Sequence, residues 1–163
     1  MASGATLAVL LPYGNEPPSA NYATLDLRNG HPVLDFDDTT AEAAIWTLVL
    51  PRNYAGGGIT VYVHWAVTTA TTGTGGWTAE FERIGAAQQD IDSDGFASAQ
   101  TITAATVDAT SGNVSITNVA VSNGANMDSI AVGESFRLRI KRDVANDTAT
   151  GDLELVAVEL KET

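Results

Sequence analysis

Apolar and polar residues alternate along most of the chain, in short runs separated by clusters of Gly, Asn, Asp and Thr. In residues 59–67 the odd positions are Ile, Val, Val, Trp and Val, while the even positions are Thr, Tyr, His and Ala. In residues 135–142, Phe, Leu and Ile alternate with Arg, Arg and Lys. Side chains alternate across a strand, so each run predicts a strand with one core face. The pattern predicts an all-β, antiparallel two-sheet jelly-roll sandwich of about eight or nine strands.

We expect a boundary between an N-terminal segment and a folded domain near residue 22. Residues 1–22 hold three of the five prolines, which favour extended geometry and do not fit inside a sheet. We therefore expect an extended N-terminal arm over residues 1–22, draped on its own domain or reaching a neighbour. The jelly-roll domain then covers residues 23–163. It opens on a strong hairpin signal, because Asn29–Gly30 is the preferred pair for a type I′ turn.

The composition narrows the range of partners. The net charge is −12, and binding to nucleic-acid phosphates or to an anionic membrane requires Lys and Arg. We therefore expect no nucleic acid and no membrane as partner. The chain has no Cys, which excludes disulfides and Cys-based metal sites. The apolar stretch 7–11 lacks a basic flank and is too short for a signal peptide or a membrane span.

Several stretches carry a family resemblance, and all of them consist of turn glycines and strand cores. The stretches are Arg28–Phe36, Leu50–Tyr54 with Gly56–Gly58, Gly133–Asp143 and Leu155–Glu159. Together they resemble the small jelly-roll virion proteins of tailed bacteriophages that decorate the capsid exterior. The likeness runs over residues 23–161 and supplies no catalytic residue.

The resemblance implies a structural virion protein and not an enzyme. Such auxiliary head or cement proteins bind the outer surface of the capsid and stabilise it, often as homotrimers. The implied partners are the major capsid protein or another virion protein, together with further copies of the chain. The implied location is the virion, on the capsid exterior, after synthesis in the host cytoplasm. The resemblance does not decide between the head and the tail of the virion.

Contacts with partners are expected at the arm and at the loop tips 68–76 and 85–99. The basic residues Arg137, Arg139 and Lys141 share one strand face. They either dock onto an acidic partner or pair across strands with acids such as Glu80, Glu82, Glu154 or Glu159. The candidate contact residues are Leu11, Pro12, Tyr13, Pro17, Pro18, Tyr54, Tyr62, Arg137, Arg139 and Lys141.

One acidic motif suggests a cation. Asp90, Asp92 and Asp94 followed by Gly95 match the start of a calcium loop, in which alternate carboxylates converge on a hard cation. The match then fails, because the twelfth position is Thr101 where that loop needs a bidentate Glu. Ca²⁺ at the three aspartates is the only cofactor candidate, and a solvated acidic loop is the alternative.

Two other functions remain open on the same fold. A carbohydrate- or receptor-binding module of a phage tail or fibre would present exposed aromatics in a groove. Trp65 and Trp77 share parity with core residues, so we expect them to be buried, whereas Tyr54 and Tyr62 are freer. A polysaccharide hydrolase would use the carboxylates at positions 35, 37 and 38. Because no nucleophile elbow or phosphate-binding loop occurs, we assign no catalytic residue.

Overall fold

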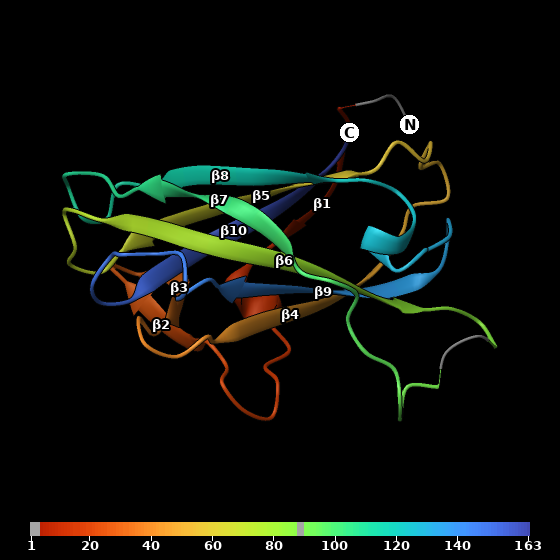
Figure 1. Ribbon diagram of the computed structural model, residues 1–163, viewed down its shortest axis with the longest axis horizontal. Coiled ribbons are helices and arrows are strands. Elements are labelled where there is room, and N and C mark those ends of the chain that lie inside the picture. The colour runs from red at the N-terminus through yellow and green to blue at the C-terminus, as the bar shows by residue number, and fades with distance from the viewer. Residues whose placement is uncertain (1–3, 88–89) are drawn as a thin grey trace.

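Two antiparallel sheets face each other in the computed structural model, which describes residues 4–87 and 90–163 (Figure 1). The predicted all-β sandwich is confirmed, and the described residues form ten strands in place of the expected eight or nine. No helix in the described part is long and apolar enough to cross a membrane. The strands are β1 (Thr6–Leu10), β2 (Thr24–Arg28), β3 (His31–Phe36), β4 (Ala43–Val49), β5 (Ile59–Val67), β6 (Thr74–Ile84), β7 (Gln100–Thr106), β8 (Ser115–Val121), β9 (Ser135–Arg142) and β10 (Leu153–Glu162), with 3₁₀ turns η1 (Pro12–Gly14) and η2 (Ala125–Met127).

One sheet, sheet A, has the order β2-β3-β10-β5-β8, and the other, sheet B, has the order β4-β9-β6-β7. β5 covers one edge of β10 from end to end. The other edge of β10 is shared, because β3 pairs with residues 153–155 and β1 with residues 158–161. A register shift between Leu155 and Ala157 marks a bulge between these two partners.

The core lies between the sheets and follows the predicted alternation. Every odd residue of β5 is buried, and Phe136, Leu138 and Ile140 of β9 are buried as expected. Trp65 and Trp77 are almost fully buried, which confirms that expectation, and their rings meet edge to face 6.2 Å apart. Phe36 packs against Trp77 in the same way at 4.9 Å. Such pairs add favourable ring contacts to the burial of apolar area.

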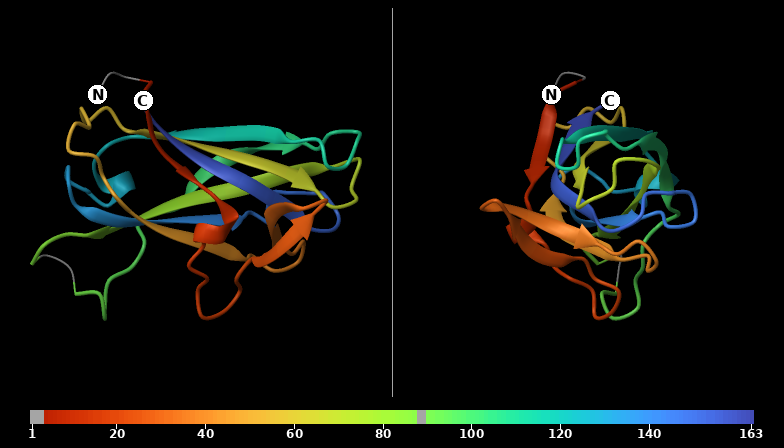
Figure 2. Two further views of the ribbon diagram at one scale, coloured as in Figure 1. Left: turned by 180° about the vertical axis from the view of Figure 1, so that it is seen from behind. Right: turned by 90° about the vertical axis from the view of Figure 1, so that its left-hand side faces the viewer.

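The arm, followed from Gly4 onward, lies along its own domain, while residues 1–3 are outside the described part. Figure 2 shows β1, in red, beside β10, in blue. The segment after η1 covers the outer edge of β4: the Ile45 N–H donates to Asn15 Oδ1, and the Glu16 N–H donates to the Ile45 carbonyl. The Trp46 indole N–H donates to the Leu11 carbonyl at 3.0 Å. The arm therefore closes an edge that would otherwise be open.

A fully buried arginine links several segments by hydrogen bonds at one end of the sandwich. Arg142, at the end of β9, makes two bonds to the Asp147 carboxylate, at 2.6 and 3.1 Å. Its other N–H groups donate to the carbonyls of Phe36, Ala149 and Gly151 at 2.8 to 2.9 Å. The guanidinium thus joins β3, β9 and the loop before β10, and its charge is compensated.

Candidate functional site

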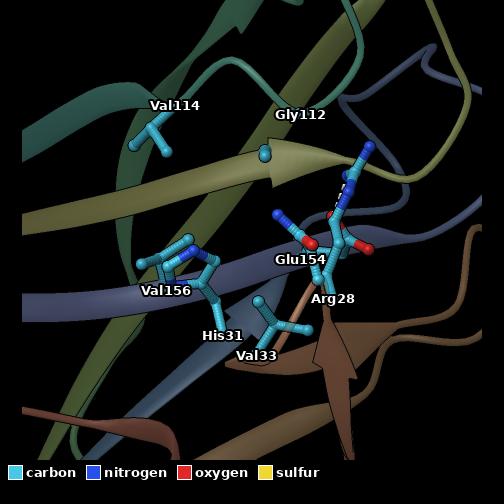
Figure 3. Close-up of a pocket in the computed structure, with 9 residues that line it drawn as sticks. Arg28, His31, Val33, Gly112, Val114, Glu154 and Val156 are labelled. Carbon is cyan, nitrogen blue, oxygen red and sulfur yellow. Dashed lines mark hydrogen bonds and ion pairs between the residues drawn. The ribbon is translucent and has the colours of Figure 1, made fainter.

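A pocket with a volume of about 390 Å³ lies on the outer face of sheet A (Figure 3). It lies between the β2–β3 hairpin and the loop that joins β7 to β8. Arg28, Asn29 and Glu154 line it with polar groups, and His31 stands at its rim. Its apolar surface comes from Val33, Ala66, Val114 and Val156.

The hairpin places half of this lining. Asn29 and Gly30 both have positive φ, at 50° and 80°, which confirms the predicted type I′ turn. In this hairpin Arg28 lies opposite His31. Asp26, two residues before Arg28, lies opposite Val33. Because side chains two positions apart share a face, Arg28 and Val33 point toward the same outer surface. The bulge in β10 adds Val156 to that surface.

An ion pair forms the polar end of the pocket. The Arg28 guanidinium pairs with the Glu154 carboxylate and donates to the Val67 carbonyl at 2.7 Å. It also approaches the next loop so closely that a Cβ on Gly112 would lie 2.8 Å from Nη2. Gly112 has φ of +90°, so both the backbone and the space favour glycine there. The arginine therefore fixes the hairpin tip against β5 and the β7–β8 loop.

A second carboxylate lies beside this pair. Asp35 occupies the position opposite Glu154 across β3 and β10. Burial, and then the negative charges of Glu154 and Asp26, raise the pKa of Asp35 to about 6. Within the described residues its buried Oδ1 accepts no hydrogen bond. This carboxyl group therefore changes charge within about a unit of neutral pH.

The chemistry of the pocket suits a small, uncharged, amphipathic ligand. Apolar side chains can contact a carbon face, while Asn29, His31 and the ion pair offer donors and acceptors. Arg28 is already neutralised by Glu154, so it does not call for an anionic ligand. Among residues 4–87 and 90–163, no three His, Asp or Glu side chains are grouped to hold a metal ion. The arrangement favours binding.

The predicted contact residues of the arm differ in their exposure to solvent. Pro12 is buried, whereas Leu11, Pro17 and Tyr13 are exposed and Pro18 is half-buried.

A second hollow, of about 280 Å³, is lined by residues that include Tyr13 and Tyr22. Tyr13 and Tyr22 are 68% and 50% exposed, so two exposed aromatic residues border this hollow. Tyr22 was missed because it stands alone between polar residues, with no alternation around it.

The prediction that Tyr54 is free for a partner is wrong. Its side chain is only 7% exposed, and its hydroxyl oxygen accepts a 2.7 Å hydrogen bond from the Gly58 N–H. The glycine-rich turn that follows therefore brings its backbone N–H to the Tyr54 hydroxyl group. Tyr62 is half-buried on the outer face of sheet A, where the Lys161 ammonium lies 5.9 Å from its ring centre.

The basic residues of β9 pair within the chain. Arg137 bonds to Glu82 at 2.9 Å, Arg139 pairs with Glu80, and the Lys141 ammonium lies 3.8 Å from Glu80. The Phe96 ring covers the guanidinium of Arg139 at 4.0 Å. The two predicted alternatives were docking onto an acidic partner and pairing across strands. The described residues form the cross-strand pairs, so these three basic side chains need no partner to balance their charge.

The aspartates of the calcium-like motif do not gather. Asp90 Oδ1 accepts the N–H of Asp92, and Asp94 Oδ1 accepts the N–H of Gly95, so both carboxylates cap a turn. The candidate Ca²⁺ site at Asp90, Asp92 and Asp94 gains no support from this geometry. Residues 88 and 89 of the predicted contact loop 85–99 lie outside the described part.

The three carboxylates considered for hydrolysis have separate environments. Asp37 accepts hydrogen bonds from Thr39 and Thr40, and these bonds lower its pKa to about 2. Asp38 accepts the Gly151 N–H at 2.8 Å, and Asp35 lies opposite Glu154 across β3 and β10. Asp37 and Asp38 therefore hold turns, which leaves one carboxylate where the hydrolase hypothesis needs two.

Sequence comparison gives no relative, since no family model and no curated protein matches the chain. Several solved structures share the fold. A family 35 carbohydrate-binding module from an environmental isolate has a TM-score of 0.56 at 11% identity, covering 96% of this chain and 93% of that one. The CBM22-1 xylan-binding domain of Paenibacillus barcinonensis Xyn10C has a TM-score of 0.54 at 10% identity, covering 99% and 96%. The module CBM6cm-2 of Cellvibrio mixtus lichenase 5A, solved with cellotriose, has a TM-score of 0.50 at 14% identity, covering 97% and 98%.

These matches span nearly the whole of each chain, and their identities are low. They define the class of fold: a single β-sandwich of the jelly-roll type found in carbohydrate-binding modules. None of them is a capsid decoration protein, so the family resemblance seen in the sequence has no counterpart among these structures.

Proposed function

We propose that this chain is a non-catalytic glycan-binding module that holds an uncharged sugar in the outer-face pocket. The observation that carries the proposal is the division of that pocket into an apolar surface and a polar end. A pyranose ring has the same division, with a carbon face and a rim of hydroxyl groups. The volume of about 390 Å³ is within the range of small-molecule sites, roughly 300–1,000 Å³.

Two further observations support the proposal. The fold is that of modules whose names describe carbohydrate or xylan binding, although fold alone does not determine function. The charges favour neutral glycans, because Arg28 is paired and Asp26 and Asp35 lie nearby in a chain of net charge −12. Anionic polysaccharides would be repelled.

The test is calorimetric titration of the purified chain with soluble xylan, mixed-linkage glucan and mannan oligosaccharides. Val114→Phe fills the pocket from an exposed position, and we expect it to weaken binding at least tenfold. Ile116→Phe is the matched control, because Ile116 is similarly exposed, lies two residues after Val114 in β8, and is outside the pocket lining. The proposal is overturned if the folded chain binds none of the glycans, or if both variants bind equally.

A second candidate function is decoration of a tailed-phage capsid. It is supported by the family resemblance and by exposed apolar side chains along β1 and β2, namely Val9, Leu25 and Leu27. Such surface side chains would become buried against a shell and stabilise it by mass action. Co-sedimentation with undecorated phage shells tests this function, and saturable binding at a stoichiometry set by the shell lattice is the expected result. Failure to sediment with any shell would count against it.

A further inference from the structure

The hollow that Tyr13 and Tyr22 border, here called the arm hollow, is separate from the outer-face pocket. Its walls come from the segment around η1 and from residues 22–25, where β2 begins. Figure 2 shows η1, in red, close to β2, in orange. The two hollows share no lining residue, so a ligand in one of them does not occupy the other.

Tyr13 is presented by a turn whose backbone is fixed. The Leu11 carbonyl accepts the Gly14 N–H at 3.0 Å and the Trp46 indole N–H at 3.0 Å. Pro12, which precedes the tyrosine, is buried, and its ring restricts its own φ. The Tyr13 side chain is nevertheless 68% exposed. The turn therefore holds an exposed aromatic ring on a rigid backbone.

Tyr22 is held by Ala43, the first residue of β4. The Ala43 N–H donates to the Asn21 carbonyl at 2.8 Å, and the Ala23 N–H donates to the Ala43 carbonyl at 3.0 Å. Tyr22 thus lies between two backbone hydrogen bonds, and its side chain is 50% exposed. Because the backbone of both tyrosines is fixed before a ligand arrives, binding costs little further ordering of the chain.

The arm hollow combines apolar contacts with unused hydrogen-bonding groups. None of the eight residues that line it carries a charge, and Leu25 adds an aliphatic side chain to the two tyrosine rings. Within the described part of the chain, the hydroxyl groups of Tyr13 and Tyr22 and the Nδ2 group of Asn15 make no hydrogen bond. Asn15 Oδ1 accepts the Ile45 N–H, which fixes the direction of this amide.

We propose that the arm hollow is a second binding site, for one neutral sugar ring. A pyranose ring has carbon-bound hydrogens on its faces and hydroxyl groups around its rim, so it matches tyrosine rings with unpaired donors and acceptors beside them. The volume of about 280 Å³ is just below the roughly 300 Å³ at which small-molecule sites begin, which suits a single ring. This inference shares its ligand class with the proposed function and concerns a different site.

The same chemistry disfavours other occupants. An apolar protein surface would bury the two tyrosine hydroxyl groups and the Asn15 amide without partners, which costs free energy. A charged ligand would find no opposite charge among the lining residues.

The experiment is NMR titration of the ¹⁵N-labelled full chain with xylotriose, cellotriose and mannotriose. We expect at least one sugar to give saturable shifts of the backbone amides of residues 13–16 and 22–25. Tyr13→Ala and Tyr22→Ala each remove one ring, and we expect each to raise the dissociation constant at the arm hollow by roughly fivefold. Tyr62→Ala is the matched control, because Tyr62 lines neither hollow. The amide spectrum of each variant verifies its fold.

The two proposed sites are tested independently. Val114→Phe fills the outer-face pocket, and we expect it to leave the shifts at residues 13–16 and 22–25 unchanged. The proposal is overturned if these amides respond to none of the sugars, if their response disappears in Val114→Phe, or if folded Tyr13→Ala and Tyr22→Ala respond like the wild type. Shifts confined to the outer-face pocket would overturn the second site and support the proposed function. Shifts confined to the arm hollow would do the reverse.

Discussion

The carboxyl group of Asp35 should make the fold less stable at neutral pH than in mild acid. Burial and the neighbouring charges of Glu154 and Asp26 raise its pKa in the folded state from 3.8 to about 6. Between these values the folded chain holds a proton that the unfolded chain releases. Stability is therefore fully retained below about pH 4 and decreases as the pH rises through 6. The Asp35→Asn variant keeps the shape of the side chain and removes the titration.

The size of the effect follows from the difference between the two pKa values. A change from 3.8 to about 6 corresponds to about 3 kcal/mol, at 1.36 kcal/mol per pKa unit. Asp35 is half-buried, and solvent screening lowers the expected gain to about 1–2 kcal/mol. We expect Asp35→Asn to be more stable than the wild type by this amount at pH 7.5 and equal to it at pH 3.5.

Urea unfolding followed by tryptophan fluorescence measures both free energies. The control is Asp92→Asn, which changes an exposed acid in the 85–99 loop and should give no pH-dependent difference. If Asp35→Asn lowered stability at pH 7.5, or raised it equally at both pH values, the argument that an uncompensated carboxylate is held beside Glu154 would be wrong.

Three further variants test the packing. Arg142→Met leaves Asp147 buried without its partner, and urea unfolding should show a loss of roughly 3–5 kcal/mol. Thr117→Val removes the acceptor of the Trp65 indole N–H, and the same assay should show a loss of about 1–3 kcal/mol. Gly112→Ala pushes a methyl group against Arg28, so calorimetry should show weaker glycan binding together with a lower melting temperature.

The strands that the sequence predicts best are those with one face in the core. β5 and β9 could be predicted directly, because their large core residues fall on alternate positions and each strand has partners on both sides. The sequence of β8 is less clear, because its apolar residues change parity between Ile116 and Val119. Such a change is typical of a bulge, but the pairing with β5 is continuous there. Ile116 is 56% exposed, so an apolar residue on the solvent face imitates a change of register.

The candidate site was much less predictable than the fold. Its central pair joins Arg28 to Glu154, which are 126 residues apart, and no local pattern links them. The sequence showed Arg28 only as part of a turn and Glu154 only as one of several acids. The hairpin turn was visible, but its position beside β10 depends on sheet order. Single-sequence periodicity identifies strands and gives no information about which strands become neighbours.

The position of β10 has a consequence for how the chain is made. β1, β3 and β5 all pair with β10, and the three of them come from the first 67 residues. During synthesis these segments leave the ribosome well before residues 153–162, so sheet A has no centre until nearly the whole chain has emerged. Until then β1, β3 and β5 lack the strand β10 with which each of them pairs. We therefore expect this sheet to form late in synthesis, and we expect the incomplete sheet to be prone to aggregation until β10 has emerged.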